Sequence, residues 1–339
     1  MRLEGLETWM DSQGLGDGPL TDARRLGGGT QNVLLRFSRG GRDFVLRRPQ
    51  AGRGPKADEA LAREARVLGA LASTDAPHPA LIALCENPNV MGTAFLLMAP
   101  VEGFNAVEAL PPLHAGDPAL RWRMGLAIAE AAARIGAVDY ERVGLAGCGR
   151  LDGFLERQVP RWTAQLEGYG KLPGWPGPAA LGDLADVGRW LEDRRPARFQ
   201  AGLTHGDFHI ANVMYRPGDG EVAAVIDWEL ATIGAPLLDL GWLIATWPDP
   251  ALADEPPLPL ETWDGFPPPH ALIEAYAGNS ALDLADFGWW RVMAAFKLAI
   301  LLEGGFARAC AGLAARDVGE RLHARSLKLA GRAQAWMAQ

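Results

Sequence analysis

Short apolar runs that alternate with polar residues dominate the first hundred positions and are typical of β-strands. Strands are predicted at residues 32–37, 43–47, 81–85 and 94–98. The first two are separated by Ser38-Arg39-Gly40-Gly41, which predicts a hairpin turn. Over residues 58–71 the apolar residues recur at helical spacing instead, so one helix is expected there.

Beyond about residue 104 the apolar spacing changes to that of amphipathic helices. Helices are expected over residues 120–138, 154–169, 184–191, 237–245, 272–276 and 287–302. Two short strands, 211–215 and 222–226, interrupt this helical region. We therefore predict an α+β chain of two lobes, with a small β-rich N-lobe over residues 1–100 and a larger, mainly helical C-lobe over residues 101–339.

Composition narrows the class of protein. Hydrophobic residues make up 48% of the chain and charged residues 22%, as in an ordinary globular protein. The formal net charge of −8 gives no support for a nucleic-acid or anionic-membrane partner. The three cysteines are scattered without paired spacing, so neither a disulfide framework nor a zinc site is expected, and a reducing cytoplasm fits. The first twenty residues do not resemble a signal peptide, and no apolar stretch is long enough to cross a bilayer.

The segment 203–228 (LTHGDFHIANVMYRPGDGEVAAVIDW) carries the strongest chemical signal. Asp207 and Asn212 are five positions apart, which is the spacing of the D-x-x-x-x-N catalytic loop of protein kinases. Asp227 follows a hairpin and an apolar strand, where a kinase carries a metal-binding aspartate. Phosphoryl transfer needs an acceptor for the proton of the substrate hydroxyl and oxygen ligands for Mg²⁺. Asp207 is therefore the candidate base, and Asn212 and Asp227 are the candidate metal ligands.

The motif HGDFHIAN followed by IDWELATIGAPLLDLGW resembles the aminoglycoside phosphotransferase (APH) family. It is most similar to the kinase-like domains related to those fused to certain acyl-CoA dehydrogenases. The resemblance implies a two-lobed, protein-kinase-like fold that uses ATP and Mg²⁺, with Asp207 as base and Asn212 and Asp227 as metal ligands. It also implies a structural role for Asp239, which would hold the catalytic loop. His205 and His209 are expected to be structural hydrogen-bonding residues of that loop.

The N-terminal third fits the same family more loosely. The glycine-rich segment with Gly28, Gly29 and Thr30 stands where a nucleotide-covering loop is expected, although three glycines before a strand can also form a flexible turn. Arg47 replaces the usual strand lysine and can still bind phosphate as a planar fork. Glu64 matches the helix glutamate that pairs with this strand base. Met98 begins the hinge, whose backbone would contact adenine.

Two other functions are open from the sequence. The first is a metal-dependent hydrolase, in which His205-x-Asp207-x-His209 would bind zinc. That function leaves Asn212 and Asp227 without a role. The second is a non-catalytic nucleotide-binding module, which the replacement of lysine by Arg47 favours. Retention of all three candidate groups of the catalytic segment favours an enzyme instead.

The acceptor is a small-molecule hydroxyl that the motifs do not identify. The resemblance favours a hydroxy acid or hydroxyacyl-CoA over an aminoglycoside. Lys297 lies inside an almost entirely apolar run, residues 289–302, that predicts a buried helix. A buried ammonium needs a partner, so Lys297 either pairs with an acid of the C-lobe or holds an anionic group of the acceptor. The sequence does not distinguish ATP from GTP and predicts no oligomeric state.

Overall fold

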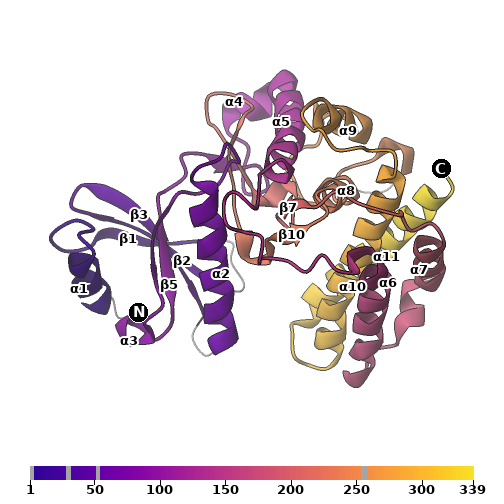
Figure 1. Ribbon diagram of the computed structural model, residues 1–339, viewed down its shortest axis with the longest axis horizontal. Helices are drawn as coiled ribbons and strands as arrows, with labels where there is room; N and C mark the ends of the chain where they lie inside the picture. The colour runs from indigo at the N-terminus through magenta and orange to yellow at the C-terminus, as the bar shows by residue number, and fades with distance from the viewer. Residues whose placement is uncertain (1–3, 28–31, 51–53, 253–257) are drawn as a thin grey trace.

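The computed structural model describes residues 4–27, 32–50, 54–252 and 258–339, which form a β-rich and a helical region (Figure 1). The β-rich region contains a five-stranded antiparallel sheet in the order β1-β2-β3-β5-β4. Its strands are β1 (Thr21–Leu26), β2 (Asn32–Arg39), β3 (Arg42–Pro49), β4 (Leu81–Cys85) and β5 (Phe95–Met98). Its helices are α1 (Glu4–Ser12), α2 (Pro55–Leu71) and α3 (Pro88–Met91).

The two faces of the sheet pack against different helices. Successive side chains of a strand point to opposite faces. Accordingly, Phe44 and Leu46 of β3 belong to the core shared with α1, whereas Val45 belongs to the core shared with α2. Arg47 therefore points to the α2 side. Arg48 lies on the other side, where it is partly buried and its Nη1 donates to the Met91 carbonyl at 3.1 Å.

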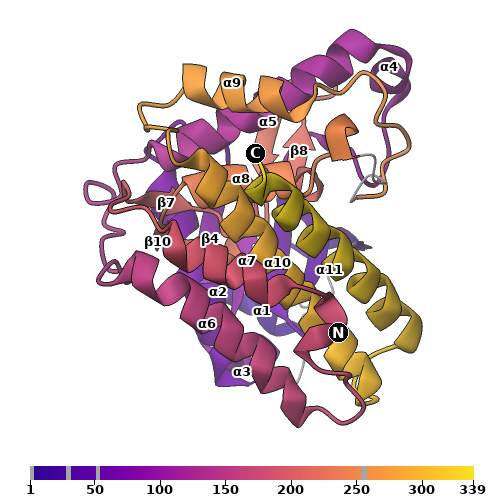
Figure 2. The ribbon, with the colours of Figure 1, turned by 90° about the vertical axis from the view of Figure 1, so that its right-hand side faces the viewer.

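The helical region holds eight α-helices among the described residues. These are α4 (Pro112–Gly116), α5 (Pro118–Gly136), α6 (Phe154–Gly168), α7 (Leu184–Asp193), α8 (Leu237–Ala245), α9 (Pro269–Gly278), α10 (Phe287–Cys310) and α11 (Arg316–Met337). Helix α10 is buried at its centre, as expected, and α11 runs alongside it (Figure 2). None of the helices in the described part of the chain combines the length and apolarity needed to cross a bilayer.

Short strands connect this helical framework to the catalytic segment. They are β6 (Phe104–Asn105), β7 (Gly202–Thr204), β8 (Val213–Tyr215), β9 (Val222–Val225) and β10 (Thr232–Gly234). Strand β8 pairs with β6 and β9, and β10 pairs with β7. Strand β5 ends at Met98 in the large sheet, whereas β6 already pairs with β8. A lobe boundary near residue 100 stays a prediction.

Several elements are absent from the sequence prediction, among them β1, α1 and α11. Strand β1 (TDARRL) is exposed along nearly its whole length, so it has no alternating apolar pattern. Helix α1 is short, and its apolar side chains pack on the outer face of the sheet. Helix α11 has a polar surface, and few large apolar residues mark its buried side. Each element depends on contacts with distant segments that local periodicity does not reveal.

Candidate active site

Asp207 lies in the loop between β7 and the 3₁₀ turn Ile210–Asn212. The Asn212 side-chain amide donates to the Asp207 carbonyl at 2.9 Å and to its carboxylate at 3.1 Å. His209 Nε2 lies 3.3 Å from the same carboxylate. Burial would raise the pKa of Asp207, but the contacts with His209 and Asn212 outweigh it and lower the pKa below its ordinary value. Asp207 is therefore ionised at neutral pH and can accept a hydrogen bond or a proton from a hydroxyl.

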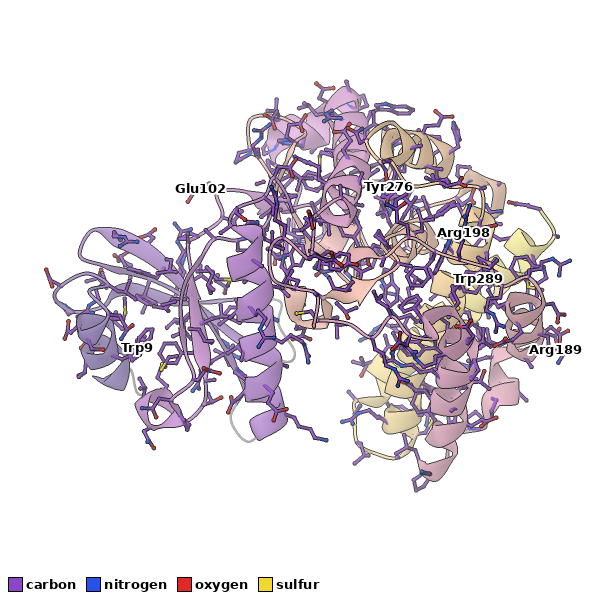
Figure 3. The ribbon with its side chains drawn as sticks, viewed as in Figure 1. Trp9, Glu102, Arg189, Arg198, Tyr276 and Trp289 are labelled. Atoms are coloured by element: carbon purple, nitrogen blue, oxygen red, sulfur yellow. The ribbon has the colours of Figure 1, made fainter. Side chains whose placement is uncertain are left out.

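Asp239 holds the backbone that precedes Asp207. Its carboxylate accepts hydrogen bonds from the backbone N–H groups of His205 at 2.5 Å and Gly206 at 3.0 Å. Figure 3 draws the described side chains of the whole molecule on its ribbon. Burial raises the pKa of Asp239 to about 6. Gly206 has φ +86°, and a Cβ there would lie 2.5 Å from the Leu230 carbonyl, so only glycine fits. These contacts support the structural role expected of Asp239.

Both ring nitrogens of His205 contact the backbone of the fold. Its Nε2 donates to the Ile226 carbonyl at 2.9 Å, and its Nδ1 lies 3.4 Å from the Asp207 amide. Burial lowers its pKa, so the ring is neutral. Both ring nitrogens are thereby used within the fold, and no group of three or more His, Cys, Asp or Glu in the described residues is arranged to hold a metal. This geometry contradicts a zinc cluster of His205, Asp207 and His209.

Asp227 is brought beside the catalytic loop by the end of β9. The Ile226 amide donates to the Asn212 carbonyl at 2.8 Å. Because Ile226 directly precedes Asp227, this hydrogen bond joins the backbone of the two candidate metal ligands. Asp227 has a left-handed backbone with φ 69°, and its side chain keeps 38% exposure. Aspartate tolerates this conformation better than most residues. A carboxylate and an amide oxygen are hard donors that fit Mg²⁺, so the residues present are compatible with the metal that the fold implies.

Arg47 connects the sheet with helix α2 and with the turn after β9. Its Nε lies 3.1 Å from the Glu64 carboxylate, and its Nη2 lies 2.5 Å from Asp227 and 3.0 Å from Glu229. Arg47 and Glu64 are buried. Burial raises the pKa of Glu64 to about 7. Burial opposes the charge of Arg47, but the three carboxylates outweigh it and raise the pKa of its guanidinium, which therefore stays charged.

Two further residues of this cluster were not predicted from the sequence. Glu229 accepts from the Asn32 side-chain amide at 2.9 Å in addition to its contact with Arg47. Asn32 directly follows the glycine-rich segment, and Glu229 stands two positions after Asp227. Both residues line a cavity of about 210 Å³ that also touches Glu64. The position of each residue beside a known motif could have suggested it as a site residue. The hydrogen bond between them spans 197 residues, so no local pattern predicts it.

The other residues predicted to bind the nucleotide are Gly28, Gly29, Thr30 and Met98. Gly28, Gly29 and Thr30 lie outside the described residues. Met98 ends β5, where it pairs with Val45, and it is buried. The Ala99 amide that follows already donates to the Ala80 carbonyl at 2.9 Å. An adenine contact at this hinge stays a prediction.

Lys297 lies between two indole rings of the helical region. Its Nζ is 4.7 Å from the Trp242 ring centroid and 5.4 Å from that of Trp162. No described carboxylate lies within 4 Å of the ammonium, so a close pair with an acid, the first of the two expected arrangements, is not formed. Burial lowers its pKa to about 8, and the more distant charge of Asp239 counteracts this only in part. Indole faces stabilise the cation without neutralising it.

The two lobes, the carboxylate of Asp207 and the link between Asn212 and Asp227 define the class of kinase-like phosphotransferases. The chain belongs to the phosphotransferase enzyme family (APH), whose family model matches residues 22–263. It is therefore an enzyme of the small-molecule kinase type, and the family predicted from the catalytic segment is confirmed.

Relatives of the chain include proteins named acyl-CoA dehydrogenases. Human acyl-CoA dehydrogenase family member 11 is 30% identical over 290 residues, which cover 83% of this chain and 35% of the relative. Mouse acyl-CoA dehydrogenase family member 10 is 27% identical over 281 residues, covering 80% of this chain and 25% of the relative. The chain thus spans only a quarter to a third of these proteins.

Solved structures confirm the fold class. A candidate aminoglycoside phosphotransferase from Ralstonia eutropha JMP134 superposes with a TM-score of 0.78, at 27% identity and with 98% of both chains covered. A thermostable mutant of the aminoglycoside phosphotransferase APH(4)-Ia, crystallised with AMP-PNP and hygromycin B, gives a TM-score of 0.60 at 16% identity, covering 95% of this chain and 97% of the other. At 16% identity, the similarity to APH(4)-Ia shows a shared fold alone.

Proposed function

We propose that the chain transfers the γ-phosphoryl group of ATP to a hydroxyl of a small molecule in a Mg²⁺-dependent reaction. The observation that carries this proposal is the direct link between the Asp207–Asn212 loop and the Asp227 turn through the Ile226 amide. It gathers a proton acceptor and two oxygen ligands at one place. Structural neighbours crystallised with AMP-PNP or ADP support a nucleotide substrate.

Each residue has a definite task in this mechanism. Asp227 and Asn212 would hold the metal, which would neutralise charge on the phosphate oxygens. Asp207 accepts the proton of the attacking hydroxyl, and Asn212 and His209 orient its carboxylate. Arg47 donates to phosphate oxygens, while Glu64 keeps its guanidinium in the cleft. Asp239 and His205 fix the loop. Gly28, Gly29 and Thr30 are proposed to cover the phosphates, and the backbone at Met98 to contact adenine.

The proposed acceptor is a hydroxy acid or a hydroxyacyl-CoA. The relatives named acyl-CoA dehydrogenases support an acyl substrate class. Lys297 supports an anionic acceptor, because its ammonium has no close carboxylate in the described structure and Arg161 adds a second cation beside the same Trp162 ring. Two cations disfavour a polycationic drug. A cytoplasmic location, where ATP is available, belongs to this proposal.

An ATP-consumption screen tests the proposed reaction. Purified protein with Mg²⁺ is offered hydroxy acids, hydroxyacyl-CoAs, amino alcohols and aminoglycosides, and ADP release is compared with that of Asp207→Ala. We expect turnover with an acid or acyl-CoA that the variant loses. Binding of ATP without turnover on any acceptor would favour the non-catalytic module that Arg47 first suggested. Turnover on aminoglycosides alone would contradict the acceptor class.

A further inference from the structure

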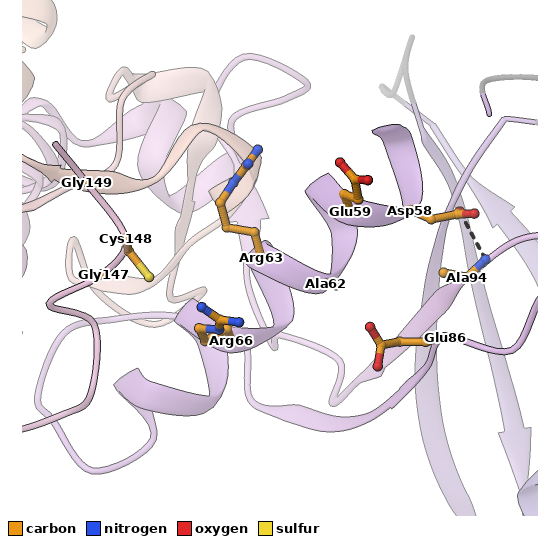
Figure 4. A pocket seen from close by; sticks show the side chains of 10 residues that line it. All are labelled: Asp58, Glu59, Ala62, Arg63, Arg66, Glu86, Ala94, Gly147, Cys148 and Gly149. Carbon is orange, nitrogen blue, oxygen red and sulfur yellow. Dashed lines mark hydrogen bonds between the residues drawn. The ribbon is translucent and has the colours of Figure 1, made fainter. Parts of the chain in front are cut away.

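A second cavity lies outside the catalytic cleft, between helix α2 and the loop 147–149 of the helical region (Figure 4). Its volume is about 670 Å³. The lining residues come from one face of α2, from the segments next to β4 and β5, and from the loop. None of the catalytic residues described above lines this cavity, and Arg63 is the one lining residue that it shares with the smaller cavity beside Glu64 and Glu229.

Charges in this cavity are separated into two ends. Arg63 and Arg66 face the loop with Cys148, whereas Glu59 and Glu86 lie at the opposite end (Figure 4). Both arginines are exposed, and no described carboxylate lies within ion-pair distance of either guanidinium. The remaining acid, Asp58, accepts hydrogen bonds from Thr93 and Ala94 and forms no ion pair with either arginine.

Both walls of the cavity are held in place. The Cys148 carbonyl accepts from the Thr232 hydroxyl at 2.7 Å and from the Ile233 amide at 3.3 Å. A Cβ on Gly149 would lie 2.2 Å from the Ile233 carbonyl, so the loop packs directly on β10. Opposite, the Asp58 carboxylate receives the Ala94 amide at 3.1 Å, which ties the start of α2 to the sheet. The arginines therefore face a preformed space, which lowers the entropic cost of binding.

We propose that this cavity binds a small phosphate-bearing molecule. Its phosphate contacts Arg63 and Arg66, because two guanidinium forks on adjacent turns can bind phosphate oxygens through charged hydrogen bonds. The other end of the molecule carries an amine or another hydrogen-bond donor that meets Glu59 and Glu86. A second anionic group at that end is disfavoured by the same carboxylates.

Cys148 supplies a direct probe, because its partly exposed thiol lines the arginine end of the cavity. Alkylation by iodoacetamide is followed by peptide mass spectrometry, and Cys310, which is also partly exposed but does not line the cavity, is the control within the same molecule. Inorganic phosphate, glycerol 3-phosphate and phosphoethanolamine are the added ligands. The assay needs no nucleotide and no turnover, so its result is independent of the proposed reaction.

Phosphoethanolamine is expected to slow alkylation of Cys148 about 10-fold at ~10 times its Kd, with Cys310 unaffected. Glycerol 3-phosphate and inorganic phosphate should protect more weakly, because they lack the amine. The double variant Arg63→Gln/Arg66→Gln should lose protection, whereas Arg308→Gln/Arg321→Gln, with the same change of charge, should keep it. Absence of protection up to ~10 mM, or protection that persists without Arg63 and Arg66, would overturn the site. Equal protection by all three ligands would overturn the role of Glu59 and Glu86.

Discussion

Single side chains in the catalytic segment have sharply different environments. Asp207 keeps a low pKa because His209 and Asn212 contact its carboxylate, whereas Asp239, a similar carboxylate in a deeper site, has its pKa raised to about 6 by burial. The carboxylate of Asp207 receives the side-chain amide of Asn212, whereas that of Asp239 receives two backbone amides. The opposite pKa shifts of these two aspartates therefore follow from burial and hydrogen bonding, since the residue type is the same.

Asp207→Asn should reduce turnover by at least ~10²-fold, because the amide cannot accept the proton of the attacking hydroxyl. Nucleotide affinity should change little. Steady-state kinetics with the acceptor and calorimetric titration of nucleotide measure the two effects. Asp186→Asn, an exposed acid on α7, is the matched control and should keep normal turnover. Wild-type turnover in Asp207→Asn would remove Asp207 from its role as base.

Replacement of Asp227 should abolish the Mg²⁺-dependent part of ATP binding, because the variant loses a carboxylate ligand. Calorimetric titration of MgATP is the measurement. Alanine at φ 69° adds a backbone cost of about 1–2 kcal/mol, so Asp227→Asn, which tolerates the left-handed conformation, is needed beside Asp227→Ala. Unchanged MgATP affinity in both variants would exclude Asp227 from the metal site.

Arg47→Lys should weaken nucleotide binding roughly 10-fold while the fold is kept, because one ammonium cannot replace a fork that reaches Glu64, Asp227 and Glu229 together. The neighbouring Arg48→Lys is the control, since that side chain lies on the other face of the sheet and contacts a carbonyl near α3. If both variants bind nucleotide like the wild type, Arg47 has no phosphate contact.

At the scale of elements, one contact joins the start of β2 to the turn after β9. Asn32 and Arg47 come from the sheet, and both donate to Glu229 beyond Asp227. The start of β2 and the turn after β9 are thereby fixed relative to each other. Glu229 is best understood as a positioning residue of this cleft.

A double-mutant cycle measures this connection. Asn32→Ala and Glu229→Gln should each lower the free energy of unfolding, and their effects should be coupled by about 1 kcal/mol, as for one charge-assisted hydrogen bond. Chemical denaturation of the four proteins is the measurement. Asn32→Ala combined with Glu192→Gln, a residue of α7 outside the cluster, should show additive effects. Additivity in the Asn32/Glu229 cycle would mean that the hydrogen bond contributes no stability.

Sequence periodicity located most elements but few of their contacts. The D-x-x-x-x-N spacing identified Asp207 and Asn212 because both lie in one short loop. The Arg47–Glu64 pair followed from the family motif, and the two side chains are indeed in contact. The contact between Arg47 and Asp227 spans 180 residues and depends on how the lobes close, so no local pattern contains it. Lys297 was expected to be buried, but its indole partners could not be inferred.

At the scale of the whole molecule, Lys297→Met tests how the helical lobe selects its acceptor. The change keeps the apolar stem and removes the charge. If Lys297 holds the acceptor, KM for the acceptor should rise ~10-fold, while KM for ATP and the melting temperature change little. Arg308→Met, an exposed site on the same helix, is the control. A large loss of melting temperature with an unchanged acceptor KM would make the lysine structural.

The same proposal predicts a pH dependence. The ammonium of Lys297 has a pKa of about 8. It is charged below that pH and loses its proton as the pH rises through it, so affinity for an anionic acceptor should be highest below pH 8 and fall above it. The acceptor KM measured from pH 6.5 to 9.5 shows this, and Lys297→Met should have a flat profile. If the acceptor KM of Lys297→Met still rises with pH, another titrating group causes the rise and the prediction for Lys297 is wrong.

Helix α11 provides the last support for the catalytic lobe. The buried Arg332 donates to the carbonyl of Trp247 at 2.6 Å and to that of Ala245 at 3.2 Å, where α8 ends. Helix α8 also carries Asp239. On the ribosome, the chain emerges from its N-terminus, so α8 is synthesised 87 residues before the arginine that closes its carbonyl end. The catalytic loop of a nascent chain therefore has its full support only after α11 has left the exit tunnel.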